Sequence, residues 1–200
     1  MRIPVIVAAA GGSTRCPGNK LLVPYHGKPL LKWLLDSLSA HRDLGRLIVV
    51  TGAQRLEVEA LLYPYPQARA VHNPHWTAGL ASSLRRGVEA LPPTRGFLVA
   101  MGDTPFFSAL TVSRILPRSS DESVRARVPT HRAEEGYPMY FPGQCRAEWK
   151  ALEGEQGARS ILRRLPQVER IPVDDPGVLK DLDRLEDFPA ADTLDIASAR

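Results

Sequence analysis

The feature that most constrains this chain is a series of short apolar runs separated by segments with helical periodicity. Residues 4–10, 47–51 and 97–101 are nearly continuous runs of apolar side chains. A strand with one face in water alternates polar and apolar residues, whereas a strand covered on both faces is apolar throughout. The runs therefore predict parallel strands at the centre of an open α/β sheet, with helices on both faces.

The remaining segments fit the same architecture. Apolar residues recur at helical spacing over 30–38 and 80–91. Further helices are expected at 56–62, 146–152 and 158–165 and after Glu186, with strands at 68–72 and 169–173. Regularity weakens after Pro117, where charged residues and serines are followed by short extended pieces, and we interpret this part as an insertion that shapes a second pocket. An extended segment is expected at 178–179.

Composition limits the class of protein. A chain of 200 residues with 44% hydrophobic content can bury one core, so we expect a single domain over 1–200. The net charge of +4 is mild and no basic block is present, so we expect no nucleic-acid partner. No segment has membrane-spanning length, and we expect no membrane partner. Two widely spaced cysteines, Cys16 and Cys145, favour the reducing cytoplasm over a secreted disulfide framework.

The first apolar run ends in a glycine-rich turn that is suited to bind phosphate. Small residues such as Gly11, Gly12 and Ser13 at the end of a strand expose backbone N–H groups, which bind phosphate oxygens. The side chains of Arg15 and Lys20 would add positive charge to this cradle. The turn matches neither a Walker loop nor the G-x-G-x-x-G fingerprint. The alternative is a turn that only reverses the chain.

Aspartates in two places could hold a metal ion. Asp103 directly follows the run 97–101, so its carboxylate should project at the carboxyl end of that strand, where ligands of such sheets bind. Asp181 and Asp183 form a second acidic pair, and in an extended segment both would point to one side. Magnesium that is also bound by phosphates needs one or two protein carboxylates. The alternatives are that Asp103 caps a helix starting at Ser108, and that the late pair is a solvated turn.

A loop at 73–79 leads into the helix expected at 80–91. Ser82 or Ser83 could present a hydroxyl to a nucleotide base or ribose. Capping of the helix is the structural alternative for both serines.

Together these segments resemble the molybdenum cofactor cytidylyltransferases and their relatives, within the larger group of Rossmann-like nucleotidyltransferases. The matching motifs follow in order along nearly the whole chain. They are Ala8-Ala-Ala-Gly-Gly-Ser-Thr-Arg15 with Lys20, Gly27-Lys-Pro-Leu-Leu31, Asn73-Pro74, Gly79 with Ser82-Ser83-Leu84, Gly102-Asp103, Gly136-Tyr-Pro-Met-Tyr-Phe141, Gly154 with Gly157-Ala158-Arg159, and Asp181-Leu-Asp183.

The resemblance implies a three-layer Rossmann-like nucleotidyltransferase fold and a role for each matching position. The implied nucleotide-binding residues are Ala9, Ala10, Gly11, Gly12, Ser13, Arg15, Lys20, Gly79, Ser82 and Ser83. Arg15, Lys20 and Asp103 would act in catalysis, and Asp103 and Asp183 would bind Mg²⁺. The acceptor would be bound near Gly136, Tyr137 and Pro138. Residues 1–116 would form the nucleotide-binding half, and 117–200 would bind the acceptor and complete the metal site.

The implied reaction is magnesium-dependent transfer of CMP from CTP to a phosphorylated acceptor, with molybdopterin favoured, by a cytoplasmic monomer or weak homodimer. Ala9-Ala10-Gly11, in place of the Ala-Gly-Gly of guanylyl-transferring relatives, indicates CTP. The alternatives are a guanylyltransferase or a sugar- or polyol-phosphate nucleotidyltransferase, a nicotinamide-dependent dehydrogenase, and a nucleotide-binding regulator without turnover. The dehydrogenase is disfavoured because the run 47–51 is followed by Gly52 rather than an acidic residue for a ribose.

Overall fold

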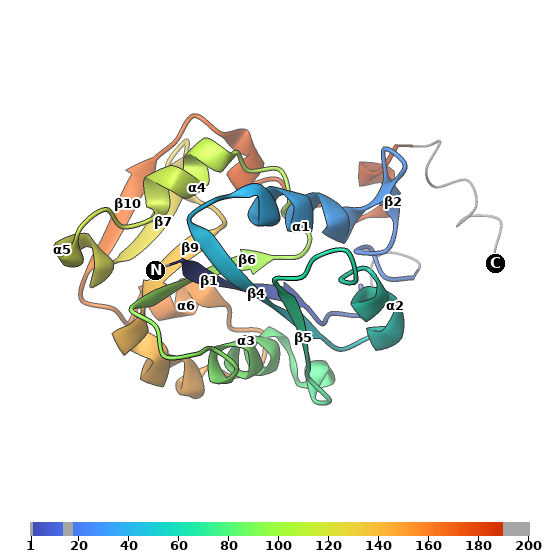
Figure 1. The fold of residues 1–200 in the computed structure, drawn as a ribbon, viewed down its shortest axis with the longest axis horizontal. Helices are drawn as coiled ribbons and strands as arrows, with labels where there is room; N and C mark the ends of the chain where they lie inside the picture. Colours follow the sequence, from blue (N-terminus) through green and yellow to red (C-terminus); the bar gives the residue numbers. More distant parts are fainter. Residues whose placement is uncertain (1, 14–17, 190–200) are drawn as a thin grey trace.

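A mixed sheet of eight strands forms the centre of the computed structural model, which describes residues 2–13 and 18–189. The strand order is β10-β7-β9-β6-β1-β4-β5, and β8 pairs with β7 (Figure 1). The strands are β1 Ile3–Ala9, β4 Leu44–Thr51, β5 Ala68–His72, β6 Gly96–Met101, β7 Ala126–His131, β8 Glu134–Glu135, β9 Met139–Pro142 and β10 Val168–Pro172. A separate hairpin pairs β2 Pro24–Tyr25 with β3 Lys28–Pro29.

The parallel centre of the sheet confirms the prediction from the apolar runs. β1 pairs in parallel with β4 on one side and β6 on the other, and β4 pairs in parallel with β5. Val7 is fully buried between Val49 and Ala100. Burial on both faces explains why these strands lack polar alternation.

Helices cover both faces of the sheet, which gives the three-layer α/β fold (Figure 1). Buried side chains of α1, α2 and α4 form one core with the sheet, and those of α3, α6 and η2 form another. The helices are α1 Leu30–Ala40, α2 Arg55–Ala60, α3 Leu80–Glu89, α4 Ala109–Ile115, α5 Ser120–Ser123 and α6 Ala158–Leu162, with 3-10 turns η1 Trp76–Ala78, η2 Gly143–Ala151, η3 Pro176–Val178 and η4 Leu185–Asp187.

The interpretation of the segment after Pro117 as an insertion is wrong. β9 pairs antiparallel with β6, β7 pairs antiparallel with β9, and β10 pairs in parallel with β7, so this segment extends the main sheet. The strand pattern was hidden by a buried charge. Arg127 lies in β7 with its side chain 7% exposed, and it forms ion pairs with Glu122 and Glu169 at 2.9 and 2.8 Å.

Two local expectations near the carboxyl end also differ. Val178, the first residue of the segment expected to be extended, instead ends the 3-10 turn η3, because the Asp175 side chain caps the Gly177 N–H at 3.1 Å and Pro176 occupies the first turn position. The helix expected at 146–152 is instead the 3-10 element η2. The helix expected after Glu186 falls mostly outside the described residues. Within the described ranges, no helix combines the length and apolarity needed to cross a membrane.

Candidate active site

The carboxyl ends of β1 and β6 bring the glycine turn and Asp103 together. β1 ends at Ala9, and Ala10 to Ser13 continue into the turn. At the end of β6 the N–H of Gly102 donates to the carbonyl of Ala8 at 2.9 Å. A Cβ at Gly102 would lie 2.9 Å from that same carbonyl oxygen, so the close approach favours glycine. The next residue, Asp103, therefore lies beside the turn.

Lys20 links the turn to two carboxylates that are distant in sequence. Its backbone N–H donates to the Ser13 hydroxyl at 3.0 Å. Its ammonium nitrogen lies 2.6 Å from Oδ2 of Asp103 and 2.6 Å from Oδ1 of Asp183. The Lys20 side chain is only 14% exposed. Charge-assisted hydrogen bonds of this length in a partly buried site are among the stronger polar contacts of a protein.

Asp183 reaches this point because the late segment is tied to both sides of the site. The N–H of Leu182 donates to the carbonyl of Asp103 at 3.2 Å. The N–H groups of Asp183 and Arg184 both donate to Oδ2 of Asp187, at 2.9 and 2.8 Å. The segment is therefore held by a turn of its own and by a backbone contact to Asp103.

Electrostatics set this cluster apart from an ordinary ion pair. Burial lowers the pKa of Lys20, but the charges and hydrogen bonds of Asp103 and Asp183 outweigh burial and raise that pKa above its usual value of 10.5. Burial raises the pKa of the nearby Asp181 carboxyl, and the charges of Asp183 and Asp103 raise it further. Two carboxylates thus share one ammonium group with a third carboxyl nearby, and the cluster retains an excess of negative charge.

This donor set fits a magnesium ion that is shared with phosphates. Asp103 and Asp183 each place an oxygen at the same distance from one nitrogen, so a single cation can contact both carboxylates. Among residues 2–13 and 18–189, no group of three His, Cys, Asp or Glu side chains is arranged to hold a metal. Magnesium commonly binds through one or two carboxylates, with phosphate oxygens and water completing its six positions.

The alternative in which Asp103 caps a helix does not hold. α4 is capped by Ser108, whose hydroxyl accepts the N–H of Thr111 at 3.1 Å. The N–H of Ser108 is in turn bound by Asp175 at 2.8 Å. Asp103 is therefore not needed to satisfy the start of that helix.

The two serines of α3 have different surroundings. The Asn73 amide donates to both hydroxyls, at 2.9 Å for Ser82 and 3.0 Å for Ser83. The Ser82 hydroxyl also lies 2.9 and 2.8 Å from the carbonyl oxygens of His75 and Gly79, so it is engaged in holding the loop. Ser83 lines the cavity described next. The motif that contains Asn73 gave this residue no role. Its buried contacts show that it positions the Ser82 and Ser83 hydroxyls.

A cavity of about 720 Å³ joins these parts at the carboxyl rim of the sheet. On one side are Lys20, Asp103, Asp181 and Asp183, and on the other are the glycine turn and the start of α3. The lining residues that were given no binding role from the sequence are Ala8, Leu21, Trp76, Thr77, Leu80, Met101 and Glu155. Leu21 belongs to the core under α1, whereas Trp76 and Leu80 belong to the core under α3, so the cavity straddles the edge of the sheet. Arg15, predicted to bind phosphate, lies outside the described residues, as does Cys16.

The residues predicted for the acceptor, Gly136, Tyr137 and Pro138, are not among those that line this cavity. The N–H of Tyr137 donates to the carbonyl of Val178 at 2.9 Å, and the N–H of Gly136 donates to Pro129 at 2.9 Å. Pro138 follows through a cis peptide bond. Burial raises the pKa of the Tyr137 phenol, Arg159 lowers it, and the charge of Asp103 raises it. Tyr137 is thus near enough to the acidic cluster to sense its charge.

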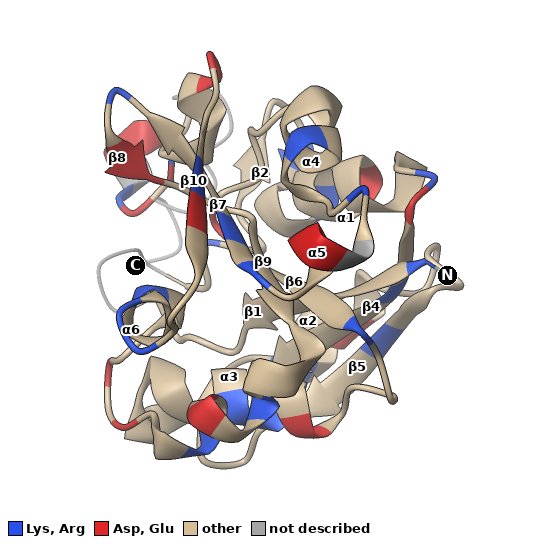
Figure 2. Cartoon of the chain, turned by 90° about the vertical axis from the view of Figure 1, so that its left-hand side faces the viewer, with Lys and Arg blue, Asp and Glu red and all other residues tan. Residues whose placement is uncertain are grey.

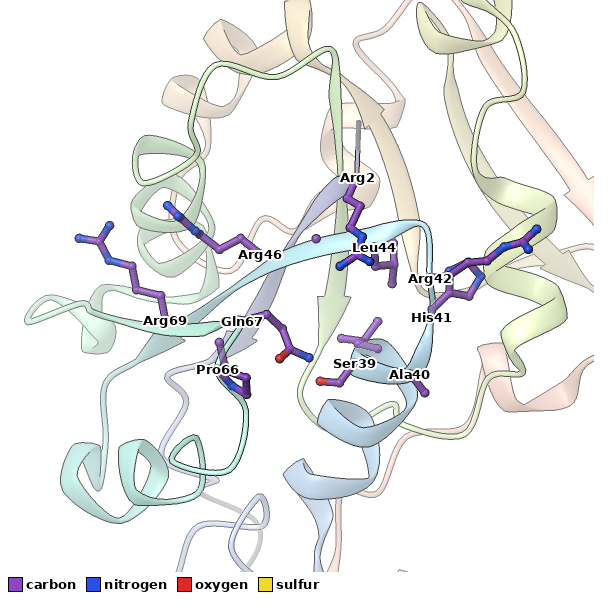
Figure 3. Close-up of a pocket in the computed structure, with 13 residues that line it drawn as sticks. Arg2, Ser39, Ala40, His41, Arg42, Leu44, Arg46, Pro66, Gln67 and Arg69 are labelled. Carbon is purple, nitrogen blue, oxygen red and sulfur yellow. The ribbon is translucent and has the colours of Figure 1, made fainter.

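A larger cavity, of about 940 Å³, lies at the opposite rim, at the amino ends of β1, β4 and β5 (Figure 3). Its lining includes Arg2, Arg42, Arg46 and Arg69, and none of the described residues that line it is Asp or Glu. Blue segments of β4 and β5 mark this basic rim near the N-terminus in Figure 2. The guanidinium groups diverge: Arg46 and Arg69 extend to one side and Arg42 to the other (Figure 3). The charged side chains that line this cavity therefore do not point toward a common position.

Comparisons with known proteins show the family of this chain. Residues 5–169 match the MobA-like NTP transferase domain. Nicotine blue oxidoreductase of Paenarthrobacter nicotinovorans is 30% identical over 191 residues, covering 91% of this chain and 92% of that protein. Molybdenum cofactor cytidylyltransferase of Escherichia coli is 23% identical over 189 residues, covering 94% of this chain and 95% of that protein.

Solved structures show the same fold. Rv0371c from Mycobacterium tuberculosis superposes with a TM-score of 0.78 and 25% identity, over 94% of this chain and 95% of that one. Its complex with manganese superposes with a TM-score of 0.69 and 22% identity, over 86% and 88% of the two chains. With more than half of its length matched by one domain family, this chain belongs to the MobA-like NTP transferases and is a nucleotidyltransferase related to the molybdenum cofactor cytidylyltransferases.

Proposed function

We propose that this enzyme transfers CMP from CTP to the phosphate group of a small acceptor, with molybdopterin favoured, and releases pyrophosphate. The observation that carries the proposal is the position of Lys20, whose ammonium contacts both Asp103 and Asp183 beside the glycine turn. A phosphate-binding turn, a lysine and two convergent carboxylates are what nucleotidyl transfer requires. The name of the Escherichia coli relative supports both the donor and the acceptor.

In the proposed reaction an oxygen of the acceptor phosphate attacks the α-phosphorus of CTP. A new P–O bond forms as the bond to the pyrophosphate oxygen breaks, and no covalent protein intermediate is needed. Backbone N–H groups of Gly11 and Gly12 would orient the triphosphate, and Lys20 and Arg15 would stabilise the leaving pyrophosphate. Magnesium bound by Asp103 and Asp183 would offset the repulsion between donor and acceptor phosphates.

Lys20 has to change partners in this scheme. Without a nucleotide its ammonium neutralises the two carboxylates that would bind the cation. A triphosphate offers a stronger concentration of negative charge within reach of a flexible lysine side chain. We therefore propose that binding of nucleotide and cation moves Lys20 from Asp103 and Asp183 to the phosphates.

The two halves of the chain would divide the work. Residues 1–116 would bind the nucleotide, whereas 117–200 would supply Asp183 and the acceptor contacts near Gly136, Tyr137 and Pro138.

We further propose a cytoplasmic monomer or weak homodimer. Burial raises the pKa of the Cys145 thiol to about 11, so this residue acts as a small apolar side chain rather than a reactive one.

A second candidate is an oxidoreductase, because the relative that is 30% identical over 91% of this chain carries that name. Such an activity would use a reduced nicotinamide cofactor. To discriminate the two activities, oxidation of that cofactor and release of pyrophosphate are both measured with the same enzyme preparation.

Thermal shift with CTP, GTP, ATP, UTP and NADH, each with and without Mg²⁺, tests the donor. At a ligand concentration of 100 Kd, binding to the native state adds about 2.7 kcal/mol to the free energy of unfolding. For a chain of this size that raises Tm by roughly 5–10 °C. We expect the largest rise with CTP and Mg²⁺ together. A larger rise with GTP or with NADH contradicts the cytidylyl assignment.

Pyrophosphate release then tests the acceptor. We expect release with CTP only when molybdopterin is present. Release with a sugar or polyol phosphate in its place would keep the chemistry and replace the acceptor.

A further inference from the structure

The cavity at the carboxyl rim contains a carboxylate that the reaction described above does not use. Glu155 lines the cavity from the turn at 153–157, on the side formed by Gly79 and Leu80. Its side chain forms no hydrogen bond or ion pair with any residue in the described part of the chain. An ionised carboxylate only accepts hydrogen bonds, so both of its oxygens are available to a ligand that donates.

The turn that carries Glu155 is fixed by contacts at both of its ends. The N–H of Gln156 donates to the carbonyl of Glu153 at 3.0 Å, which closes the turn. The N–H of Glu153 donates to Oε1 of Gln156 at 3.2 Å. Arg85 of α3 donates to the carbonyl of Leu152 at 2.6 Å. The backbone on both sides of Glu155 is therefore held before any ligand binds.

Two glycines bring this turn against the start of α3. The N–H of Ala81 donates to the carbonyl of Gly154 at 3.0 Å. Gly79 has a φ of +97°, and a Cβ there would lie 2.3 Å from the Gly154 oxygen and 2.9 Å from Oε1 of Glu155. Only glycine allows this approach. The approach places the Glu155 carboxylate over Gly79, in the cavity that Ser83 also lines.

The position of Glu155 identifies the part of the nucleotide that it would meet. Lys20, Asp103 and Asp183 mark the place of the phosphates, and a second carboxylate wall would repel those phosphates. Glu155 instead shares its side of the cavity with Trp76 and Leu80, whose apolar surfaces suit a flat base. A base can satisfy a carboxylate only if it donates an N–H. Cytosine does so through its exocyclic amino group, whereas uracil has a carbonyl at that position and carries its N–H on the adjacent ring nitrogen, N3.

Building on the proposed function, we infer that Glu155, although it belongs to the half 117–200, reaches the nucleotide and is a specificity-determining residue that accepts a hydrogen bond from the amino group of the donor base. It therefore selects cytosine over uracil. A site with an acceptor facing an amino group disfavours the analogue that has a carbonyl, because two acceptors then face each other.

The test compares CTP and UTP, whose bases differ at the C4 substituent and in the proton on the adjacent N3, in calorimetric binding with Mg²⁺ and in kcat/KM. Glu155→Gln keeps the shape of the side chain, and its amide can accept from cytosine or donate to uracil. We expect the ratio of CTP to UTP affinity to fall by about 10- to 100-fold, the value of one hydrogen bond to a charged group. Glu153→Gln, in the same turn but exposed and not lining the cavity, is the matched control and should leave the ratio unchanged.

Additional ligands distinguish recognition of the base from other roles of Glu155. dCTP tests the ribose: a change in the CTP to dCTP ratio, with the CTP to UTP ratio constant, overturns the base assignment. Wild-type protein that binds CTP and UTP equally, or binds neither, also overturns it. Because binding needs no turnover, selective CTP binding without pyrophosphate release would contradict the proposed reaction and still support the role of Glu155.

Discussion

The two rims of the sheet differ in how their charged side chains are arranged. At the carboxyl rim three carboxylates and the Lys20 ammonium converge, and both ion pairs of Lys20 are 2.6 Å long. At the amino rim four arginines line a larger cavity, yet their side chains spread apart (Figure 3). Arg2, Arg46 and Arg69 form no ion pair with any described residue. Convergence of opposite charges, and not cavity volume, therefore identifies the site.

Neutralising one charge at each rim tests which rim carries the activity, and we expect the largest effect here. Asp103→Asn removes a predicted metal ligand while keeping the size of the side chain. We expect kcat/KM for CMP transfer to fall by about 10²–10³, as for the loss of one preorganised charge. Arg46→Gln, at the amino rim, should leave the rate within about twofold. Pyrophosphate release with circular dichroism of both variants checks this, and a near-normal rate for Asp103→Asn would remove Asp103 from the mechanism.

Lys20→Met tests the role of the shared cation, because it leaves the carboxylates of Asp103 and Asp183 without their ion-pair partner. We expect transfer to slow by about 10²-fold. We also expect Mg²⁺ to raise Tm more in this variant than in the wild type, since the cation no longer competes with the ammonium. Equal Mg²⁺ responses would show that Lys20 and the metal use different positions.

The pH dependence of the same pair follows from the raised pKa of Lys20. A lysine whose folded pKa exceeds its unfolded value contributes its full stabilisation below that unfolded value, 10.5, and loses it as pH rises through the folded value. The stability difference between wild type and Lys20→Met should therefore be constant at neutral pH and shrink only in strongly alkaline solution. Urea unfolding across this range measures it, and a change near neutral pH would show that another group is titrating.

Asp175 tests whether the late segment must be held in place for the carboxylates to converge. Its side chain accepts from the Ser108 N–H, the Thr111 hydroxyl and the Gly177 N–H, at 2.8, 2.5 and 3.1 Å. Asp175→Ala leaves these donors without their partner and should cost about 1–3 kcal/mol in the free energy of unfolding. The midpoint of urea unfolding should fall with an unchanged slope. The exposed neighbour allows a control, Asp174→Ala, which should have little effect, and equal losses in the two variants would contradict the argument.

Much of the fold was predictable because it depends on local pattern. The apolar runs gave the parallel centre of the sheet, and the position of Asp103 after a buried strand placed it at the carboxyl rim. Arg127 shows where this reasoning failed, because a buried arginine paired with Glu122 and Glu169 interrupts the apolar pattern of β7.

The site was predictable only in its parts. The Lys20, Asp103 and Asp183 side chains were named from motifs, but their meeting depends on contacts between segments far apart in sequence. Glu155 carries no motif signal of its own, since it reaches the cavity only through the approach of Gly154 to Gly79. Such placements depend on tertiary packing, which periodicity and spacing do not encode.

The last prediction concerns Asp181, which takes no part in the Lys20 ion pairs and whose pKa is raised by burial and by the charges of Asp183 and Asp103. Its ionised form opposes folding above the raised pKa, and this cost disappears as pH falls through that value. Asp181→Asn should therefore stabilise the metal-free protein at neutral pH by less than about 1 kcal/mol, because the group is partly exposed and screened.

Two controls decide whether convergence is the cause. Addition of Mg²⁺ should reduce the advantage of Asp181→Asn, because a dication neutralises the same cluster. Arg46→Gln also removes one charge from a group of like charges, but the arginines diverge, so Tm should not rise. Thermal unfolding of the three proteins with and without Mg²⁺ measures both effects. A rise in Tm for Arg46→Gln equal to that for Asp181→Asn would mean that like charges repel at both rims, and that the spread of the arginines does not distinguish them.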